Sequence, residues 1–393
     1  MLPLRSAPHP WWYLTLNELS GIGMPLFFVL SGFVIHYNYS ESIGRDGIKG
    51  TYNFFIARFA RLYPLFFVCV GFDVVFKYFY GQLPAAANTA LPYYLTMTQS
   101  WLYRPMNGET LIGQFGVMPQ VSWSISTEWF FYMVYPAIYF VVARLRGVRV
   151  IVTTLILFIL VVITGLVICG ASRDAIDDRA VAIWGEIASY QTHAGQSFIM
   201  WLFYFSPFSR ITEFILGVLV AALYLDVADR PVSRAEARFG AWAMALAVIA
   251  LTALYGIIYV VGVPLHWLLL LMMVMGFAPF LGVIIFCAAR YRNSLVSFLS
   301  LPRMVLCGEA SYSLYLLHLE MIYAFRWTVS PILRPSIGVA NTMRWAMLSL
   351  ATIGLSLVTW QIIEMPARRW LRKVLTLPVV RAEGQSVAIA PPF

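Results

Sequence analysis

The sequence is poor in charged residues, and it lacks the apolar core of a secretory signal peptide in its opening residues, MLPLRSAPHPWW. Only 11% of its 393 residues are charged, whereas a typical soluble domain has about one quarter. This shortage excludes an ordinary soluble protein. Together with 61% hydrophobic residues and a mean hydropathy of +0.76, it predicts an integral membrane protein.

Cysteine is also scarce, and no two of the four cysteines have the spacing of metal ligands. We therefore expect neither a metal site nor a disulfide framework. No tightly bound cofactor is expected either. Internal repeats and low-complexity linkers are not detectable, which favours one domain. The net charge of +9 would suggest nucleic acid in a soluble protein, but here the basic residues lie mainly in loops between apolar runs, so no nucleic-acid partner is expected.

Long apolar runs are what the chain has instead, and they predict an all-α polytopic bundle of about nine transmembrane helices. A spanning helix needs roughly 20 mainly apolar residues. Two stretches, 81–123 and 171–203, are too polar to span and are expected to be exposed loops. The nine candidate spans are 22–39, 62–80, 124–143, 149–170, 208–226, 240–261, 266–288, 304–325 and 344–364.

The basic residues predict the orientation of the bundle. Loops on one side hold 18 Lys and Arg residues, and those on the other side hold 9. The positive-inside rule places the richer side in the cytoplasm, together with the C-terminus. The predicted parts are an extracytoplasmic segment 1–20, a membrane domain 21–373 and a disordered cytoplasmic tail 374–393. With nine spans the N-terminus falls outside without an export signal, so we expect a further helix before residue 1.

Ser31 and Gly32 interrupt the apolar run GIGMPLFFVLSGFVIHYNY. Small residues let a neighbouring helix approach closely, and a hydroxyl at membrane depth needs a partner. Helix packing and a substrate-site role for Ser31 both remain open.

Arg58 and Arg61 stand three residues apart at the expected cytoplasmic start of a helix, before Pro64. This spacing puts both guanidinium groups on one helix face, an arrangement that suits phosphate recognition. Ordinary positive-inside anchoring is the alternative.

Glu128 follows Ser122, Ser124, Ser126 and Thr127 at the start of an apolar helix. A carboxylate there is costly without a partner, so Glu128 is a functional candidate by default. A structural tie to a neighbouring Arg or Ser is an equal alternative.

Ser311, Tyr315 and His318 fall at positions i, i+4 and i+7 of a candidate helix that also contains Ser313. His318 suits proton transfer or substrate binding, and a hydrogen bond to a backbone carbonyl of another helix is the competing account. Further polar residues in apolar surroundings are interpreted as structural: an Arg210–Glu213 pair, Glu364 at the end of the last span, and His36, Asp73 and His266 as packing or interfacial residues.

Six segments in this order resemble the acyltransferase 3 family of bacterial membrane O-acyltransferases over roughly residues 20 to 373. They are GIGMPLFFVLSGFVI, FIARFARLYPLF, VSWSISTEWFFYMVYP, SRITEFILGV, GEASYSLYLLH and EMPARRW. The resemblance implies a ten-helix bundle that moves an acyl group, often acetyl from acetyl-CoA, onto sugars or other acceptors. It also implies that Arg58 and Arg61 bind the acyl donor, and that Glu128 is the acid of the WS-x-x-x-E segment.

One family feature is missing. The family's first helix carries an arginine and, about eleven residues later, a histidine thought to be catalytic. Arg5 and His9 are only four residues apart and do not match it. We therefore expect a chain truncated before its first helix and poorly active as written, with His318 as the best remaining titratable residue.

The sequence thus predicts a bacterial inner-membrane O-acyltransferase that uses acyl-CoA and acylates a hydroxyl of a sugar, a cell-envelope glycan or a lipid-linked acceptor. A histidine would deprotonate the acceptor hydroxyl. Two other hypotheses stay open, namely a multi-pass transporter or flippase and a catalytically inactive fragment.

Overall fold

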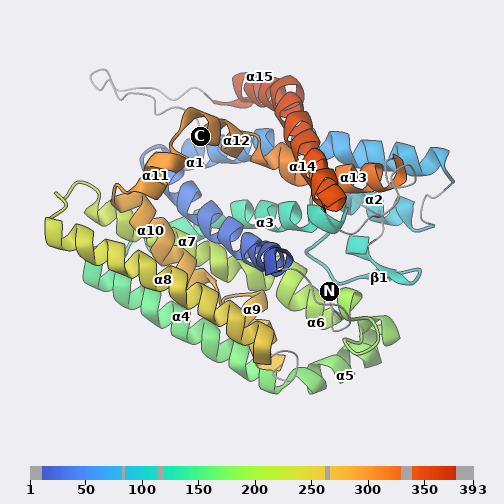
Figure 1. Ribbon diagram of the computed structural model, residues 1–393, viewed down its shortest axis with the longest axis horizontal. Helices are drawn as coiled ribbons and strands as arrows, with labels where there is room; N and C mark the ends of the chain where they lie inside the picture. Colours follow the sequence, from blue (N-terminus) through green and yellow to red (C-terminus); the bar gives the residue numbers. More distant parts are fainter. Residues whose placement is uncertain (1–10, 82–84, 114–118, 262–265, 329–338, 378–393) are drawn as a thin grey trace. The chain divides into compact units, whose positions relative to one another are not determined.

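The computed structural model describes residues 11–81, 85–113, 119–261, 266–328 and 339–377, and most of these residues are helical (Figure 1). The sheet found among them is one hairpin, in which β1 (Pro105–Met106) pairs antiparallel with β2 (Glu109–Thr110). Seven of the described helices are long and apolar enough to cross a membrane. The prediction of an all-α polytopic membrane protein is therefore confirmed.

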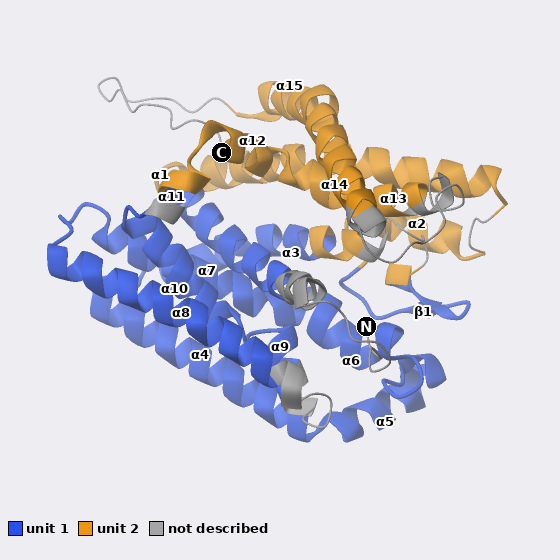
Figure 2. Ribbon diagram, viewed as in Figure 1, with its two compact units in different colours: residues 1–40, 100–111, 126–296 blue, residues 41–99, 112–125, 297–393 orange. Residues whose placement is uncertain are grey.

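The chain divides into two compact units, which are coloured separately in Figure 2. Unit 1 contains residues 1–40, 100–111 and 126–296. Unit 2 contains residues 41–99, 112–125 and 297–393. Each unit is thus assembled from segments that lie far apart in the sequence.

Helix α1 (Trp11–Phe79) contains the first two candidate spans, and its backbone leaves the helical conformation at Gly47, where φ is 53° and ψ is −121°. A Cβ atom on Gly50 would lie only 2.3 Å from the carbonyl oxygen of Ser42. Glycine at both positions allows this tight turn. The segment before Gly47 is called the first half of α1 below, and the segment after it the second half.

Unit 1 is a helical bundle around an apolar core. Helix α4 packs against α7 and α9, and α10 packs against α7 and α8. Buried core side chains include Val29, Leu216 and Val274. The helices, besides the first half of α1, are α3 (Pro119–Val142), α4 (Val148–Ala171), α7 (Pro207–Val227), α8 (Arg234–Val261), α9 (His266–Met273) and α10 (Ala278–Arg290).

The candidate span 266–288 is not one continuous helix, because the chain turns between α9 and α10. The N–H of Gly276 donates to the carbonyl of Leu271, and a Cβ atom on Gly276 would come within 2.6 Å of that oxygen. Pro279 then lies in the first turn of α10, where a missing N–H costs nothing. Glycine and proline therefore set this break.

The stretch 171–203, expected to be an exposed loop, contains short helices packed on an aromatic cluster. Tyr103 and Ala180 are buried there against Trp184, Phe198 and Trp201. The elements are α5 (Arg173–Trp184), the 3₁₀ turns η2 (Glu186–Ala188) and η3 (Ala194–Gln196), α6 (Phe198–Met200) and the π-helical segment η4 (Trp201–Phe205). Aromatic burial orders a segment that is too polar to span.

Unit 2 contains the second half of α1 and most of the C-terminal helices. Helix α13 packs against α14, and the Tyr312 hydroxyl donates to the carbonyl of Leu62 over 2.6 Å. The stretch 81–123 supplies the short helix α2, whose Tyr94 hydroxyl donates to the carbonyl of Ile112 over 2.9 Å. The elements are α2 (Ala87–Leu95), η1 (Leu111–Gly113), α11 (Ser294–Leu299, at the border with unit 1), α12 (Pro302–Glu309), α13 (Ser311–Thr328), α14 (Val339–Thr359), the π-helical segment η5 (Trp360–Glu364) and α15 (Met365–Leu375).

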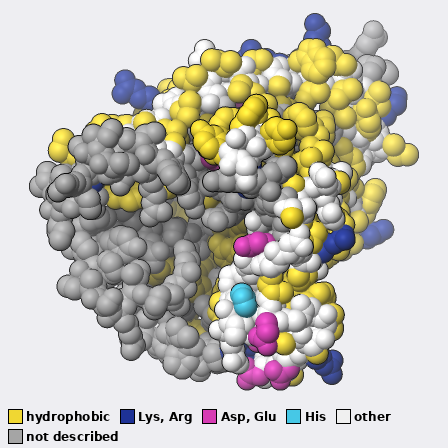
Figure 3. Space-filling view, turned by 90° about the vertical axis from the view of Figure 1, so that its right-hand side faces the viewer, with side chains coloured by type: hydrophobic (Ala, Val, Ile, Leu, Met, Phe, Trp, Pro, Cys, Tyr) yellow, Lys and Arg dark blue, Asp and Glu magenta, His cyan; other side chains and the backbone are white. Residues whose placement is uncertain are grey.

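Apolar side chains remain exposed along several helices. On α4, Leu157, Val161 and Ile168 are 56%, 70% and 60% exposed. Figure 3 shows a face on which hydrophobic side chains cover much of the described surface. Contiguous exposure of this kind marks a surface that meets lipid, so the chain is a multi-pass membrane protein.

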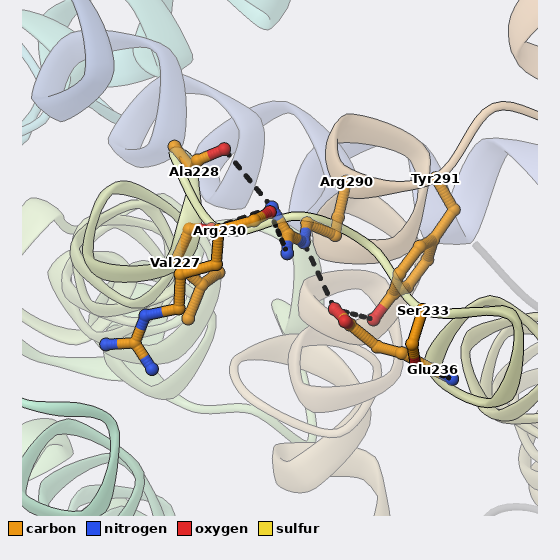
Figure 4. A network of polar contacts seen from close by, with 7 residues as sticks. All are labelled: Val227, Ala228, Arg230, Ser233, Glu236, Arg290 and Tyr291. Atoms are coloured by element: carbon orange, nitrogen blue, oxygen red, sulfur yellow. Dashed lines mark hydrogen bonds and ion pairs between the residues drawn. The ribbon is translucent and has the colours of Figure 1, made fainter.

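Arg290, the last residue of α10, holds the loop between α7 and α8 (Figure 4). Its guanidinium donates to the carbonyls of Val227, Ala228 and Arg230 over 2.7, 3.2 and 2.9 Å. Its Nε donates to the carboxylate of Glu236 over 3.2 Å. Because the last carbonyls of a helix lack intrahelical partners, this cation caps the end of α7.

Candidate functional site

Glu128 lies on α3 and is 6% exposed. Its Oε1 accepts a hydrogen bond from the Ser31 hydroxyl on the first half of α1, over 3.0 Å. The Tyr132 hydroxyl, one turn further along α3, donates to the same oxygen. The sequence-predicted residues Ser31 and Glu128 are therefore partners, and two hydroxyl donors meet one oxygen of the carboxylate.

Gly32, the neighbour of Ser31, explains how this part of α1 reaches the centre of unit 1. A Cβ atom on Gly32 would lie 2.1 Å from the carbonyl oxygen of Phe214 on α7. A Cβ atom on Gly217 would lie 2.0 Å from the carbonyl oxygen of Val29. The two glycines bring the helix backbones into contact, so Gly32 serves packing while Ser31 serves the carboxylate.

Arg210 and Glu213 on α7 form a buried ion pair, with side chains 1% and 0% exposed and Nη1 3.0 Å from Oε1. The Arg210 Nε also donates to the carbonyl of Tyr204 over 2.9 Å, and its guanidinium carbon lies 4.8 Å above the Tyr204 ring and 5.8 Å above the Phe28 ring. These contacts support the interpretation of the pair as a structural tie.

The serine and threonine residues that precede Glu128 on α3 form hydrogen bonds to neighbouring segments of the chain. In unit 1, the Ser100 hydroxyl donates to the Ser126 hydroxyl over 2.9 Å, and the Thr127 hydroxyl donates to the carbonyl of Phe205 over 3.0 Å. In unit 2, the Gln99 amide donates to the carbonyl of Ser122 over 3.1 Å. These residues therefore position α3, and Glu128 is the titratable group of the segment.

His36 is a polar residue that sequence reasoning left without a partner. It is 4% exposed, and its Nδ1 lies 3.2 Å from the hydroxyl of Tyr135 on α3. Ser31 with Glu128 and His36 with Tyr135 form two successive polar contacts between α1 and α3. The sequence offered no signal for this pairing, because 99 residues separate the two partners.

Unit 2 holds the paired arginines on the second half of α1. Arg58 is 5% exposed and Arg61 is partly exposed. Glu364 is 3% exposed, accepts the Ser313 hydroxyl over 2.8 Å and interacts electrostatically with Arg61 and Arg368. The fold thus brings Arg61 of α1, Arg368 of α15 and Ser313 of α13 together around Glu364 of η5.

Tyr315 and His318 lie further along α13. The Tyr315 hydroxyl donates to the carbonyl of Val121 over 2.9 Å and lies 2.6 Å from the Ser124 hydroxyl. The Nδ1 of His318 lies 2.6 Å from the carbonyl oxygen of Tyr315. A carbonyl only accepts, so Nδ1 carries a proton, and in a neutral ring Nε2 is then the nitrogen that can accept one.

Ser311 lies apart from these contacts, at the first position of α13, and it is exposed. Within unit 2 the buried serine of the SYSLYLLH segment is Ser313, which is 0% exposed and bonded to Glu364. Because α13 begins at Ser311, the i, i+4 and i+7 spacing still puts Ser311, Tyr315 and His318 on one side of this helix, with Ser311 at its exposed end.

A second titratable cluster in unit 2 surrounds Asp73, another residue left without a named partner. Lys77 lies 3.3 Å from the Asp73 carboxylate, and their side chains are 12% and 9% exposed. Glu320 on α13 interacts electrostatically with both groups. Asp73 is therefore one of two acids around a single lysine, and the i, i+4 spacing of Asp73 and Lys77 is the sequence signal that could have found the pair.

These features define a multi-pass α-helical membrane protein with a buried glutamate site in unit 1 and an arginine-rich site in unit 2. The family model described as "Acyltransferase domain" matches residues 3–361. Acyltransferase MdmB of Streptomyces mycarofaciens is 26% identical over 388 residues, covering 93% of this chain and 86% of that protein. No solved structure matches the chain. The chain belongs to the acyltransferase 3 family, and it is an acyltransferase.

Proposed function

We propose that this acyltransferase moves an acyl group, in the first instance acetyl, from acyl-CoA to a hydroxyl of a sugar or a cell-envelope glycan in the bacterial inner membrane. The acceptor oxygen attacks the thioester carbonyl, a C–O bond replaces the C–S bond, and CoA leaves as the thiol. The observation that carries the proposal is the arginine cluster of unit 2.

Arg58 and Arg61 are the proposed donor-binding residues. Guanidinium groups bind phosphates through parallel N–H bonds, and CoA presents several phosphates. Arg368 adds a third cation, which interacts with the same Glu364 as Arg61. The positive-inside orientation would face this cluster toward cytoplasmic acyl-CoA.

His318 is the proposed general base. Its Nδ1 proton is engaged by the carbonyl of Tyr315, which leaves Nε2 able to accept the proton of an acceptor hydroxyl. Tyr315 and Ser311 on the same helix are proposed to line the acceptor site. In unit 1, Glu128, held by Ser31, is proposed as a catalytic carboxylate, as the acidic residue of the WS-x-x-x-E segment.

The donor-binding proposal is tested by equilibrium binding of acetyl-CoA to the purified protein, which needs no acceptor. The Arg58→Gln and Arg61→Gln variants should each bind about tenfold more weakly or worse, because a hydrogen bond to a charged group contributes roughly 1.5–3 kcal/mol. Arg303→Gln, which removes an exposed arginine of α12 in the same unit, is the matched control. Equal weakening of acetyl-CoA binding in all three variants would mean that Arg58 and Arg61 act only through the overall positive charge of the unit.

The base is tested by measuring acetyl transfer to a panel of glycan and lipid-linked acceptors. His318→Gln should lower kcat by about 10²–10⁴-fold while leaving acetyl-CoA binding intact. Its pH–rate profile should also lose the ascending limb that a histidine base produces. A variant that keeps the parent's kcat and pH profile would remove His318 from the reaction.

A further inference from the structure

Helix α15 (Met365–Leu375) is an amphipathic helix that follows the last candidate span, beyond the residues that the family model matches. At 100° per residue its cations occupy one side of the helix and its apolar residues the other. The cationic side holds Arg368, Arg369, Arg372 and Lys373, and the apolar side holds Ala367, Trp370, Leu371, Val374 and Leu375.

The apolar side of α15 is itself divided. Leu371 and Leu375 on one part of it are partly buried. Trp370 and Val374 lie between that part and the cations, and they are 63% and 59% exposed. The helix therefore presents an exposed apolar strip beside an exposed basic strip.

A pair of hydrogen bonds fixes the end of α15. The Asn53 side chain on α1 accepts the N–H of Leu377 over 2.9 Å and donates to its carbonyl over 3.1 Å. The amide thus occupies both backbone groups of one residue just after the helix. These two hydrogen bonds fix the orientation of α15, and with it the exposed strips, within unit 2.

The preceding helix places α15 where the apolar span ends. Val358 and Ile362 are 51% and 67% exposed, so they continue the lipid-facing surface to the last turn before α15. The π-helical segment η5 and Pro366 then change the direction of the chain, and α15 turns away from the axis of α14 (Figure 1). A basic, Trp-bearing helix at such a point lies in the headgroup region of a bilayer.

We propose that α15 is an in-plane helix that binds anionic phospholipid headgroups. The exposed cations Arg369, Arg372 and Lys373 meet the lipid phosphates, while Trp370 and Val374 enter the boundary of the acyl chains. Phosphate-bearing lipid is the occupant because charge and apolar exposure occur side by side, a combination that a soluble anion does not need. The inference does not depend on the acyl donor.

The test uses the full chain in vesicles of phosphatidylcholine with phosphatidylglycerol. Val374→Cys is labelled with bimane in a Cys307→Ser background, because Cys307 is the exposed native cysteine among the described residues. Quenching by a trace of spin-labelled phosphatidylglycerol is compared with quenching by spin-labelled phosphatidylcholine at the same mole fraction. The anionic lipid should quench several-fold more strongly, since each cation near an anionic surface favours binding by about fivefold.

Charge variants show whether α15 causes that preference. Arg369→Gln/Lys373→Gln should bring the quenching ratio close to 1, and 1 M salt should do the same because screening then acts within about 3 Å. Arg144→Gln/Arg146→Gln, which removes two exposed arginines from the loop between α3 and α4, is the matched control and should keep the parent ratio. A parent ratio of 1, or equal loss in both double variants, overturns the proposal.

An arm with excess CoA separates lipid from a soluble phosphate ligand. The quenching ratio should be unchanged by CoA if headgroups occupy the cations. Loss of the ratio on addition of CoA would assign α15 to nucleotide binding and would overturn the lipid site, whatever acetyl-CoA binding at Arg58 and Arg61 shows.

Discussion

Among the described residues, unit 1 buries Glu128 and Glu213 and unit 2 buries Glu364, and the two units surround these carboxylates differently. In unit 1, Arg210 and Glu213 form an ion pair whose side chains are 1% and 0% exposed. Glu128 of the same unit is hydrogen-bonded only by hydroxyl groups among the described residues. In unit 2, Glu364 meets the Ser313 hydroxyl and feels Arg61 and Arg368, both of which keep part of their surface exposed. A fully buried ion pair can only stabilise the bundle, whereas a partly exposed group of arginines can also bind an anion.

The largest expected effect on stability comes from breaking the buried Arg210–Glu213 ion pair of unit 1. Arg210→Met should lower the free energy of unfolding by about 3–5 kcal/mol, because it leaves Glu213 buried without its cation. Arg210→Met/Glu213→Leu should recover most of the loss, since an apolar pair of similar volume needs no desolvated charges. Chemical denaturation in detergent measures both. A double variant as unstable as the single one would show that Arg210 acts through its other contacts.

Close helix contact in unit 1 should produce the next largest effect. Gly217→Ala forces a Cβ atom to within 2.0 Å of the Val29 carbonyl oxygen, so we expect a loss of about 1–3 kcal/mol or more. Gly71→Ala in the second half of α1 is the matched control, because nothing lies within 4 Å of the new atom. That control should be neutral or stabilising by up to about 1 kcal/mol, as alanine favours helix. Equal melting temperatures for the two variants would contradict the close contact.

Neutralising Glu364 of unit 2 should lower the free energy of unfolding less than breaking the Arg210–Glu213 pair of unit 1. Glu364→Gln keeps an acceptor for Ser313, and Arg61 and Arg368 retain access to solvent. We expect a loss of about 1 kcal/mol, the size of one hydrogen bond. Glu213→Gln, measured beside it by thermal unfolding, should be clearly less stable. The reverse order would remove the distinction drawn between the two units.

The smallest effect concerns pH and two buried tyrosines outside the membrane helices. Burial and the nearby Asp177 raise the pKa of Tyr103 in unit 1 to about 12, and burial raises the pKa of Tyr94 in unit 2 well above its ordinary value. An unfolded tyrosine ionises near pH 10. Stability is therefore unaffected below about pH 10 and falls as pH rises through 10 to 12, because only the unfolded chain releases the proton.

Thermal unfolding at a series of alkaline pH values measures the slope with which stability falls as pH rises. Tyr103→Phe should flatten it between about pH 10 and 12, and Tyr94→Phe should flatten it over a range that extends further. The Tyr103 variant also loses a hydrogen bond to the carbonyl of Gln196, so its stability at neutral pH is compared first. An unchanged alkaline slope in both variants would mean that other groups dominate there.

The apolar runs alone were enough to predict the long apolar helices, because a chain in a bilayer must satisfy its backbone groups locally. Each of the nine candidate ranges is mostly helical, although the breaks between α9 and α10 and between α12 and α13 divide two of them. The breaks at Gly276 and Ala310 depend on local turns that hydropathy does not register. The truncation expected before residue 1 concerns residues outside the described ones.

By itself the sequence determined the class of the protein, its long apolar helices and the family, since composition, span length and ordered motifs are local properties. It also singled out Ser31, Arg58, Arg61 and Glu128 by residue type in apolar surroundings. Only the tertiary structure decided the partners, such as Ser31 with Glu128 and Ser313 with Glu364. Those pairs join residues 97 and 51 positions apart, and which helix faces meet depends on the packing of backbones at glycines such as Gly32 and Gly217.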